Sequence, residues 1–167
     1  MKELFRFPNP VNEVSARLVA AGVVVLGVLT IAADQPWLML LLGYGFVARV
    51  LTGPTLSPLG QFVTRVLTPN LPFAPKLVAG PPKRFAQGIG ATLSVGAVIA
   101  YYAFGSTGAA YVLVGLIVVA ATLESVFALC LGCKIFAVLI RLGVIPEEIC
   151  ERCNNIWADA PAVGPTR

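Results

Sequence analysis

The residues with the clearest chemical potential are four cysteines, all in the last quarter of the chain. They form two Cys-x-x-Cys pairs, Cys130 with Cys133 and Cys150 with Cys153, and sixteen residues separate the two pairs. Two such pairs about 15 to 20 residues apart are typical of a four-thiolate zinc site, in which each pair holds one side of a tetrahedral ion. The spacing therefore predicts a metal site formed by all four thiolates, for zinc or, with the same ligands, an iron–sulfur cluster.

Thiol exchange is a second interpretation of these residues, and inert buried thiols are a third. Cys130 and Cys133 are close enough in sequence for one thiolate to attack a disulfide and for the other to resolve the mixed disulfide. Lys134 follows directly, and its positive charge favours the thiolate form. If thiol exchange is the chemistry, Cys130 and Cys133 are the predicted catalytic pair.

The elements that must position these cysteines are long apolar helices. The chain is 57% apolar and only 12% charged, with a mean hydropathy of +0.86, whereas soluble domains are about 45 to 50% apolar and about 25% charged. Four apolar runs, 16–33, 37–52, 85–104 and 109–131, are each near the length of a bilayer crossing. Very short connections predict two antiparallel hairpins.

We therefore predict an all-α integral membrane protein, a four-helix transmembrane bundle. The expected organisation is a membrane domain over residues 1–142, a four-cysteine segment over 130–157 and a disordered tail over 158–167.

The basic residues predict how the bundle is oriented. All twelve lysines and arginines lie at one end of the runs or in the segments joined to that end, and the two short turns at the other end carry none. By the positive-inside rule, both termini and the middle loop are cytoplasmic. A cleavable signal peptide is not expected, because the first apolar run begins well inside the chain. The cysteines then lie in a reducing compartment, where a permanent disulfide is unusual.

The middle loop, residues 53–84, contains seven prolines, so no long helix is expected to run through it. Between two of the prolines, residues 59–67 carry apolar side chains at helical spacing, which predicts a short interfacial helix. Lys83 and Arg84 stand at the mouth of the third run. They are candidate contacts for an anion or cofactor, although the positive-inside pattern favours a role as headgroup anchors.

Two charged residues lie deeper within the apolar runs. Arg49 is about one turn from the cytoplasmic end of the second run, and Glu124 is about two turns inside the fourth. An ionisable side chain at such depth costs several kcal/mol unless it is paired or hydrated, and is therefore a candidate functional residue. We predict that Arg49 and Glu124 face each other inside the bundle, either as part of a catalytic site or as a pair that fixes helix register.

Some functions are excluded by what the sequence lacks. The chain has no histidine, which rules out Ser-His-Asp and Cys-His catalysis and histidine-based metal sites. It has neither a strand pattern nor a glycine-rich phosphate loop, so a nucleotide site is not expected. Its pI of about 9.1 is explained by basic residues facing anionic lipid, without a nucleic-acid partner.

The chain resembles a small bacterial membrane family known as a domain of unknown function, number four-three-nine-five. The motifs that carry the resemblance are Pro10-Val11-Asn12-Glu13 with Arg17, Gly53-Pro54 with Leu56-Ser57-Pro58, Pro81-Pro82-Lys83-Arg84-Phe85-Ala86, Cys130-Leu131-Gly132-Cys133-Lys134-Ile135, Arg141-Leu142-Gly143 and residues 146–153. The resemblance implies a four-span protein of the bacterial plasma membrane, sometimes encoded with or joined to thioredoxin-like and sulfur-transfer proteins. It implies no reaction and no catalytic residues.

Three functions remain open from the sequence. The first is thiol–disulfide or sulfur metabolism with a soluble thioredoxin-like or sulfurtransferase partner. The second is a non-enzymatic scaffold or assembly subunit in which the four cysteines bind structural zinc. The third is a small transporter acting as a homo-oligomer, for which a face of small residues in the third run would allow close packing: Gly88, Gly90, Ala91, Gly96 and Ala97.

Overall fold

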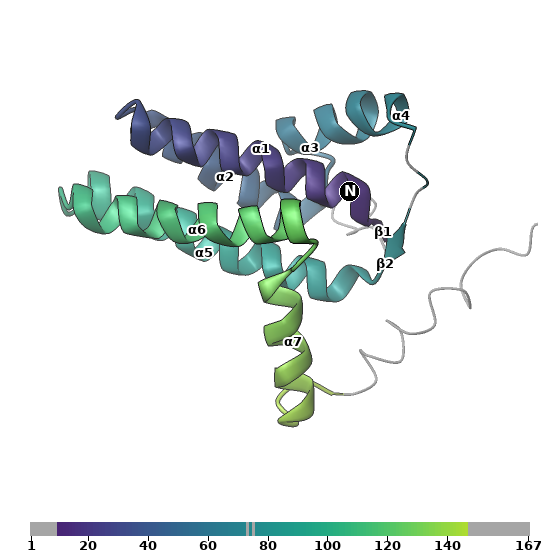
Figure 1. Ribbon diagram of the computed structural model, residues 1–167. Coiled ribbons are helices and arrows are strands. Elements are labelled where there is room, and N and C mark those ends of the chain that lie inside the picture. The colour runs from purple at the N-terminus through teal and green to yellow at the C-terminus, as the bar shows by residue number, and fades with distance from the viewer. Residues whose placement is uncertain (1–9, 73, 75, 147–167) are drawn as a thin grey trace, which may run out of the picture.

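The computed structural model describes residues 10–72, 74 and 76–146. Within them the architecture is almost entirely helical, as predicted. Four long helices form two antiparallel hairpins (Figure 1): α1 (Glu13–Ala32), α2 (Trp37–Thr52), α5 (Gly80–Tyr102) and α6 (Thr107–Phe127). These helices lie close to the apolar runs of the sequence, and α2 has the predicted bounds.

Local sequence explains where the helices begin. The side chain of Asn12 accepts a hydrogen bond from the Val14 N–H at 3.0 Å and so caps the start of α1. Helix α5 has two prolines, Pro81 and Pro82, in its first turn, where the missing N–H groups break no helical bond. The turn between α1 and α2 is closed from the second hairpin, since the Tyr111 hydroxyl donates to the carboxylate of Asp34.

The two hairpins pack side by side, α1 against α6, α2 against α5, and α5 against α6. Their shared core consists of buried apolar side chains: Ala20, Val23, Met39, Leu42, Phe46, Ala97, Ala110, Val114, Ile117 and Ala121. Small residues bring the helices close together. An added Cβ at Gly90 would lie 2.3 Å from the ring of Phe46, so this glycine lets the α2 ring rest directly on α5.

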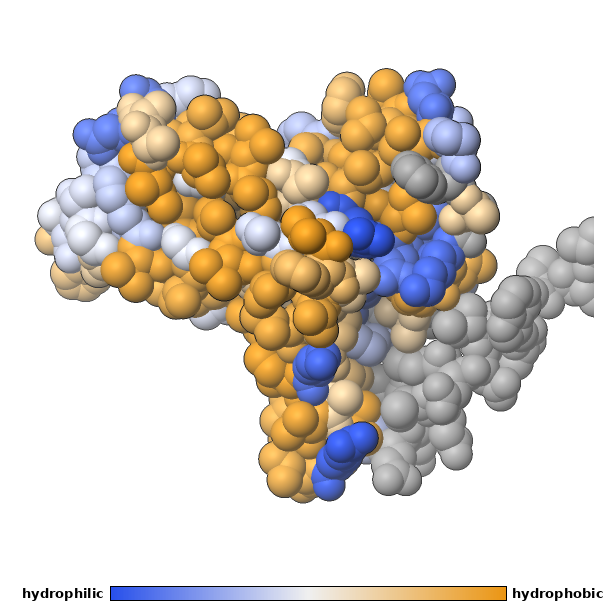
Figure 2. Space-filling model, in the orientation of Figure 1, coloured by the Kyte–Doolittle hydropathy of each residue, from blue (hydrophilic) through white to orange (hydrophobic). Residues whose placement is uncertain are grey.

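Three of the helices, α1, α5 and α6, are long and apolar enough to cross a membrane, and α2 is a shorter apolar helix of 16 residues. Their outward faces carry large apolar side chains such as Val28, Val112 and Val119, which are about half exposed. Figure 2 shows this apolar surface over the long helices. A protein that exposes so much apolar area suits a hydrocarbon environment.

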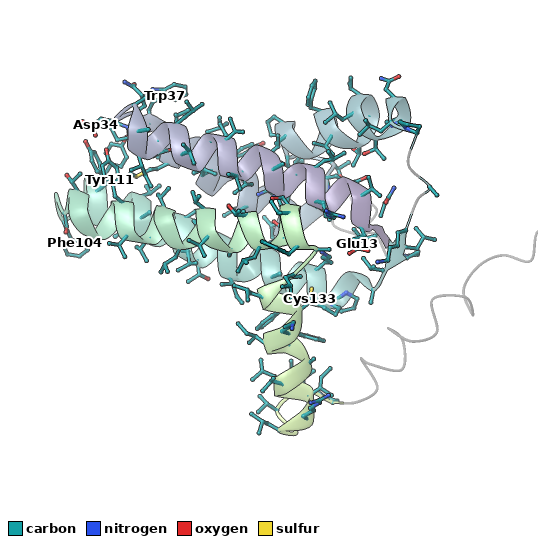
Figure 3. All side chains as sticks on the ribbon, in the orientation of Figure 1. Glu13, Asp34, Trp37, Phe104, Tyr111 and Cys133 are labelled. Carbon is teal, nitrogen blue, oxygen red and sulfur yellow. The ribbon has the colours of Figure 1, made fainter. Side chains whose placement is uncertain are left out.

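The basic residues of the long helices lie toward one end of the bundle, and the two short turns at the other end carry none. Asp34, Trp37, Phe104 and Tyr111 lie at the end with the two short turns, and Glu13 and Cys133 lie toward the other (Figure 3). The middle segment at that second end folds as α3 (Pro58–Phe62), a π-helical turn η1 (Val63–Leu67) and α4 (Thr68–Asn70). The short helix predicted over residues 59–67 is therefore present, within a slightly longer helical stretch.

A small two-stranded sheet was not predicted. Val11–Asn12 (β1) pairs antiparallel with Leu77–Val78 (β2), and Lys76 forms an ion pair with Glu13 at 2.8 Å beside this small sheet. A two-residue strand has no recognisable alternation, so sequence periodicity gives no signal for it. The pairing fastens the middle segment to the start of α1.

The fourth long helix ends earlier than its apolar run. Helix α6 stops at Phe127, and Ala128 adopts a left-handed conformation with φ of 55°. The last carbonyls of α6, of Ser125 and Val126, accept hydrogen bonds from the Arg17 guanidinium at 2.9 to 3.2 Å. The predicted boundary near residue 131 is therefore corrected: a separate helix, α7 (Leu131–Arg141), begins there and runs across the direction of the long helices (Figure 1).

Candidate functional site

The first cysteine pair sits at the start of α7, not at the end of a long helix. The chain reverses at Ala128, and Cys130 becomes the residue that caps α7. Its Sγ accepts a hydrogen bond from the Cys133 backbone N–H at 3.3 Å. A helix N-terminus carries partial positive charge and free N–H groups, so this position favours a thiolate over a thiol.

The two thiols of the pair are chemically unequal. A hydrogen bond from the Cys133 thiol lowers the pKa of Cys130 and raises that of Cys133, which keeps its proton in the bond. Cys130 is buried, with 9% of its surface exposed, whereas Cys133 is partly exposed. Cys130 is therefore the stronger candidate for the ionised nucleophile and leaving group, and Cys133 is the residue that solvent reaches more easily.

Gly132, inside the Cys-x-x-Cys pair, allows α7 to lie directly on α5. A Cβ at this position would lie 2.5 Å from the Ala86 Cα, a backbone atom that cannot move aside. The rings of Phe85 and Phe136 pack nearby, with centroids 5.5 Å apart. The glycine thus fixes the cysteine pair against the first turns of α5.

We expect Gly132→Ala to destabilise the protein by about 1 to 3 kcal/mol, because the added methyl must push α7 off α5. Gly88→Ala is the matched control, since a Cβ at Gly88 meets no atom within 4 Å and alanine favours a helix. The free energy of unfolding in detergent, measured for both variants, checks this. Equal stability of the two variants would show that α7 does not pack on α5 as described.

Beside the cysteine pair lies a buried ion pair. The Lys83 Nζ is 2.5 Å from Glu124 Oε1, and the two side chains are only 11% and 15% exposed. This corrects two expectations. Lys83 is not an exposed headgroup anchor but the ionic partner of Glu124, and Glu124 pairs with Lys83 instead of Arg49. The cause is that α5 begins at Gly80, earlier than the apolar run, and so carries Lys83 inside the packed region.

Arg49 is held by neutral groups from two other elements. Its Nε donates to Gln87 Oε1 on α5 at 2.9 Å, and its Nη1 donates to Ser57 Oγ at 3.1 Å. Ser57 in turn caps α3 by accepting the Gly60 N–H. The guanidinium also lies over the Phe46 ring, 4.5 Å from its centroid. Arg49 is only 5% exposed, so this network links α2, α3 and α5 inside the protein.

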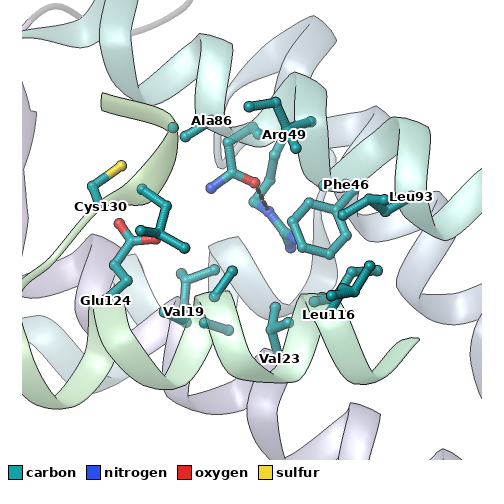
Figure 4. Close-up of a pocket in the computed structure, with 18 of the residues that line it drawn as sticks. Val19, Val23, Phe46, Arg49, Ala86, Leu93, Leu116, Glu124 and Cys130 are labelled. Carbon is teal, nitrogen blue, oxygen red and sulfur yellow. Dashed lines mark hydrogen bonds between the residues drawn. The ribbon is translucent and has the colours of Figure 1, made fainter. Parts of the chain in front are cut away.

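A cavity of about 270 Å³ joins these groups. Glu124 and Cys130 line one side of it and Arg49 the other, with apolar residues of α1 and α6 between them (Figure 4). Arg49 and Glu124, which were predicted to face each other inside the bundle, line the same cavity but form no direct ion pair. Arg84 lies apart from this cavity: it is exposed and donates to the Val50 carbonyl at the end of α2 at 3.0 Å.

The four-cysteine metal site remains a prediction. Cys150 and Cys153 lie outside the described residues, and among the residues that are described no group of three or more His, Cys, Asp or Glu side chains is placed to hold a metal ion. Within the described part, Cys130 and Cys133 are free cysteines placed as thiol partners. They would supply two ligands to such a site.

Sequence reasoning missed Gln87 and Ser57 as partners of Arg49. A signal was present, since Ser57 precedes a proline and so reads as a helix cap. Gln87 lies four residues after Lys83, on the same helical face. The packing of α2 against α5 decides which buried cation donates hydrogen bonds to Gln87 and Ser57. Spacing along the chain does not reveal this packing.

Comparison with known proteins places the chain in a family. A family model described as a domain of unknown function (DUF4395) matches residues 11–141, well over half of the chain, including Cys130 and Cys133. No curated protein and no solved structure matches it. The sequence motifs, the helical architecture and the extent of this match agree, and the chain belongs to the DUF4395 family.

Proposed function

We propose that the chain is a multi-pass protein of the bacterial plasma membrane, with α1, α2, α5 and α6 as four spans and both termini in the cytoplasm. The charge pattern supports this orientation. Helix α7 also suits it, because it runs across the bundle at the end that carries the basic residues. Lys134 and Arg141 are exposed on this helix. The helix and its C-terminal end also expose a stripe of apolar side chains: Leu131, Ile135, Val138 and Leu142. An amphipathic helix of this kind lies in the membrane interface.

We further propose that Cys130 and Cys133 perform thiol–disulfide exchange with a soluble thioredoxin-like or sulfurtransferase partner. The observation that carries this proposal is the placement of Cys130 as the cap of α7, with its sulfur accepting the Cys133 N–H at 3.3 Å. The family match reinforces the choice of pair, because it includes Cys130 and Cys133 and ends before the second pair. Lys83 adds a nearby positive charge that favours the Cys130 thiolate.

The order of the exchange steps follows from the difference in pKa between the Cys130 and Cys133 thiols. In the oxidised form, a partner thiolate attacks the Cys133 sulfur, forms a mixed disulfide there and releases the Cys130 thiolate. Release is favoured at Cys130 because a thiol of lower pKa is the better leaving group. The second thiol of the partner then attacks the mixed disulfide, which frees Cys133. The partner ends as a disulfide, and the chain gains two electrons and ends as a dithiol.

Trapping of the mixed disulfide tests this proposal. The chain is purified in detergent as a Cys150→Ser/Cys153→Ser variant with its first pair oxidised, and is mixed with reduced thioredoxin whose second cysteine is replaced by serine. We expect a covalent adduct attached through Cys133, identified by peptide mass spectrometry. Absence of an adduct, or attachment only through Cys130, would contradict the proposed exchange.

The scaffold alternative makes a different prediction for the natural chain. If the four cysteines form a structural zinc site, protein purified anaerobically without chelator contains about one zinc per chain, with all four thiols protected. Under the exchange proposal, we expect a zinc content far below one per chain, together with rapid, reversible oxidation of Cys130 and Cys133. Metal analysis and a free-thiol count on one sample separate these outcomes.

A further inference from the structure

The cavity between the hairpins contains a buried cation, Arg49, with which no carboxylate of the described residues forms an ion pair. Arg49 is 5% exposed, and its two hydrogen bonds go to the neutral oxygens of Gln87 and Ser57. Across the described residues, 10–72, 74 and 76–146, no carboxylate lies within ion-pair distance of Arg49, and the hydrogen bonds of its guanidinium come from Nε and Nη1. A guanidinium has five N–H donors, so several stay available.

The nearby carboxylate does not balance this charge. Glu124 lines the same cavity but is 2.5 Å from the Lys83 ammonium, which neutralises it. The Cys130 thiolate also lies on the Lys83 side of the cavity, so Lys83 is the cation next to both anionic groups. The Arg49 guanidinium, across the cavity, has no anion in contact with it among the described residues. Burying a charge without such a contact costs several kcal/mol, and an anion bound at Arg49 would offset this cost. The unpaired guanidinium thus points to an anionic ligand.

The dimensions of the cavity limit what that ligand is. Its volume is about 270 Å³, and a cavity of about 150 Å³ holds benzene. A ligand of about ten non-hydrogen atoms fits on this scale. Cys130 lines the side of the cavity opposite Arg49 (Figure 4). A small molecule held by its anionic end at Arg49 therefore presents its other end toward the sulfur of Cys130.

We propose that this cavity binds a small anionic sulfur compound, a disulfide or thiosulfonate, with its anionic group at Arg49 and its reactive sulfur toward Cys130. This proposal rests on the proposed exchange function and names the molecule that oxidises the pair. Cys130 faces the cavity and accepts the small compound, whereas the partly exposed Cys133 faces the protein partner. The two cysteines thereby connect a small-molecule oxidant to a soluble protein reductant.

A small disulfide can oxidise the Cys130–Cys133 pair in two steps. The Cys130 thiolate attacks one sulfur of the compound, the sulfur–sulfur bond breaks, and the other half leaves as a thiolate. Cys133 loses its proton and attacks the Cys130 sulfur, which forms the Cys130–Cys133 bond and releases the remaining half as a second thiolate. The compound thus takes two electrons, and the cysteine pair is oxidised. A thiosulfonate reacts in the same way, with a sulfinate as the first leaving group.

Two thiol reagents that differ in charge test the proposal. Sulfonatoethyl methanethiosulfonate is anionic, methyl methanethiosulfonate is neutral, and both transfer their thioalkyl group to a thiolate with release of methanesulfinate. The rate at which each consumes the Cys130 thiol, as the adduct or as the Cys130–Cys133 disulfide that follows it, is measured by peptide mass spectrometry on the full chain in neutral detergent. We expect Arg49→Gln to slow the anionic reagent about tenfold or more, since a charge-assisted hydrogen bond is lost, and to leave the neutral reagent within about twofold.

Two variants serve as controls. Lys76→Gln removes one positive charge from an exposed side chain outside the cavity and should not alter the preference for the anionic reagent. Arg49→Lys keeps the charge and should retain part of that preference. Unreactive ethanesulfonate should compete with the anionic reagent in the natural chain.

Each outcome supports or overturns a specific statement. If Arg49→Gln slows both reagents equally, or neither, Arg49 does not select an anion and the cavity proposal is wrong, while the exchange function stands. If neither reagent consumes the Cys130 thiol in the natural chain, either as an adduct or as the Cys130–Cys133 disulfide that follows it, the exchange function itself fails. If phosphatidylglycerol in the micelle blocks the anionic reagent but ethanesulfonate does not, a lipid headgroup occupies Arg49 and the small-molecule proposal is overturned.

Discussion

Lys83→Met is expected to destabilise the protein strongly, although it leaves the cysteines intact. It removes the ammonium that lies 2.5 Å from Glu124 while keeping the length of the side chain. Glu124, 15% exposed, is then left as an uncompensated carboxylate in an apolar bundle. Removal of one partner from a buried ion pair costs about 3 to 5 kcal/mol. The free energy of unfolding in detergent or bilayer nanodiscs measures the loss.

Two further variants show whether that loss comes from the stranded charge. Lys83→Met/Glu124→Leu removes both charges and should recover most of the stability, because apolar residues often replace a buried pair without loss. Lys76→Met breaks a second ion pair, with Glu13, where the lysine is 72% exposed. Its cost should stay below about 1 kcal/mol. A double variant as unstable as Lys83→Met would show that packing, and not charge, explains the loss.

The fold was largely predictable because it follows from apolar length and short turns. Each long helix corresponds to a run of apolar residues, and the connection at 33–36 leaves room only for a hairpin. The errors fall where local backbone conformation overrides hydropathy. Residues 128–131 continue the apolar run, yet Ala128 turns the chain and α7 starts afresh. A left-handed alanine leaves no trace in a hydropathy pattern, since its side chain is as apolar as those before it.

The candidate site was predictable as a set of residues but not as a set of partners. Cys130, Cys133, Arg49, Glu124 and Lys83 were all identified from residue type and depth, and the structure places them around or next to one cavity. Their pairing depends on helix rotation and on the crossing of α2 with α5, which spacing along the chain does not encode. The position of Cys130 as a helix cap likewise required knowledge of where α6 ends.

Three local features of the chain position the cysteine pair. Arg17 binds the last carbonyls of α6, the left-handed Ala128 reverses the chain, and Gly132 lets α7 lie on Ala86. Together these features place Cys130 where a helix terminus, the Cys133 thiol and the Lys83 ammonium all act on one sulfur. The same features leave Cys133 partly exposed, so that the pair presents one thiol inward and one outward.

The pH at which Cys130 ionises should therefore lie below that of an ordinary thiol and should depend on Cys133. The largest cause of the lowered pKa is the hydrogen bond from the Cys133 thiol, which stabilises the Cys130 thiolate. The alkylation rate of Cys130 should rise with pH and level off above the lowered pKa. Cys133→Ala removes the donor and should move this midpoint to higher pH. Cys133→Ser keeps a hydroxyl donor and should give a smaller displacement in the same direction.

Measurement of the midpoint is more informative than the rate at one pH, because a thiolate of lower pKa is also a weaker nucleophile and the two effects partly cancel. The pH profile of iodoacetamide labelling, followed at Cys130 by peptide mass spectrometry, reports the midpoint directly. Cys150→Ser/Cys153→Ser is the control and should leave it unchanged if the first pair acts alone. A midpoint that stays fixed in Cys133→Ala but moves in Cys150→Ser/Cys153→Ser would contradict the exchange pair, because it would place the controlling thiol in the second pair and favour a shared four-cysteine site.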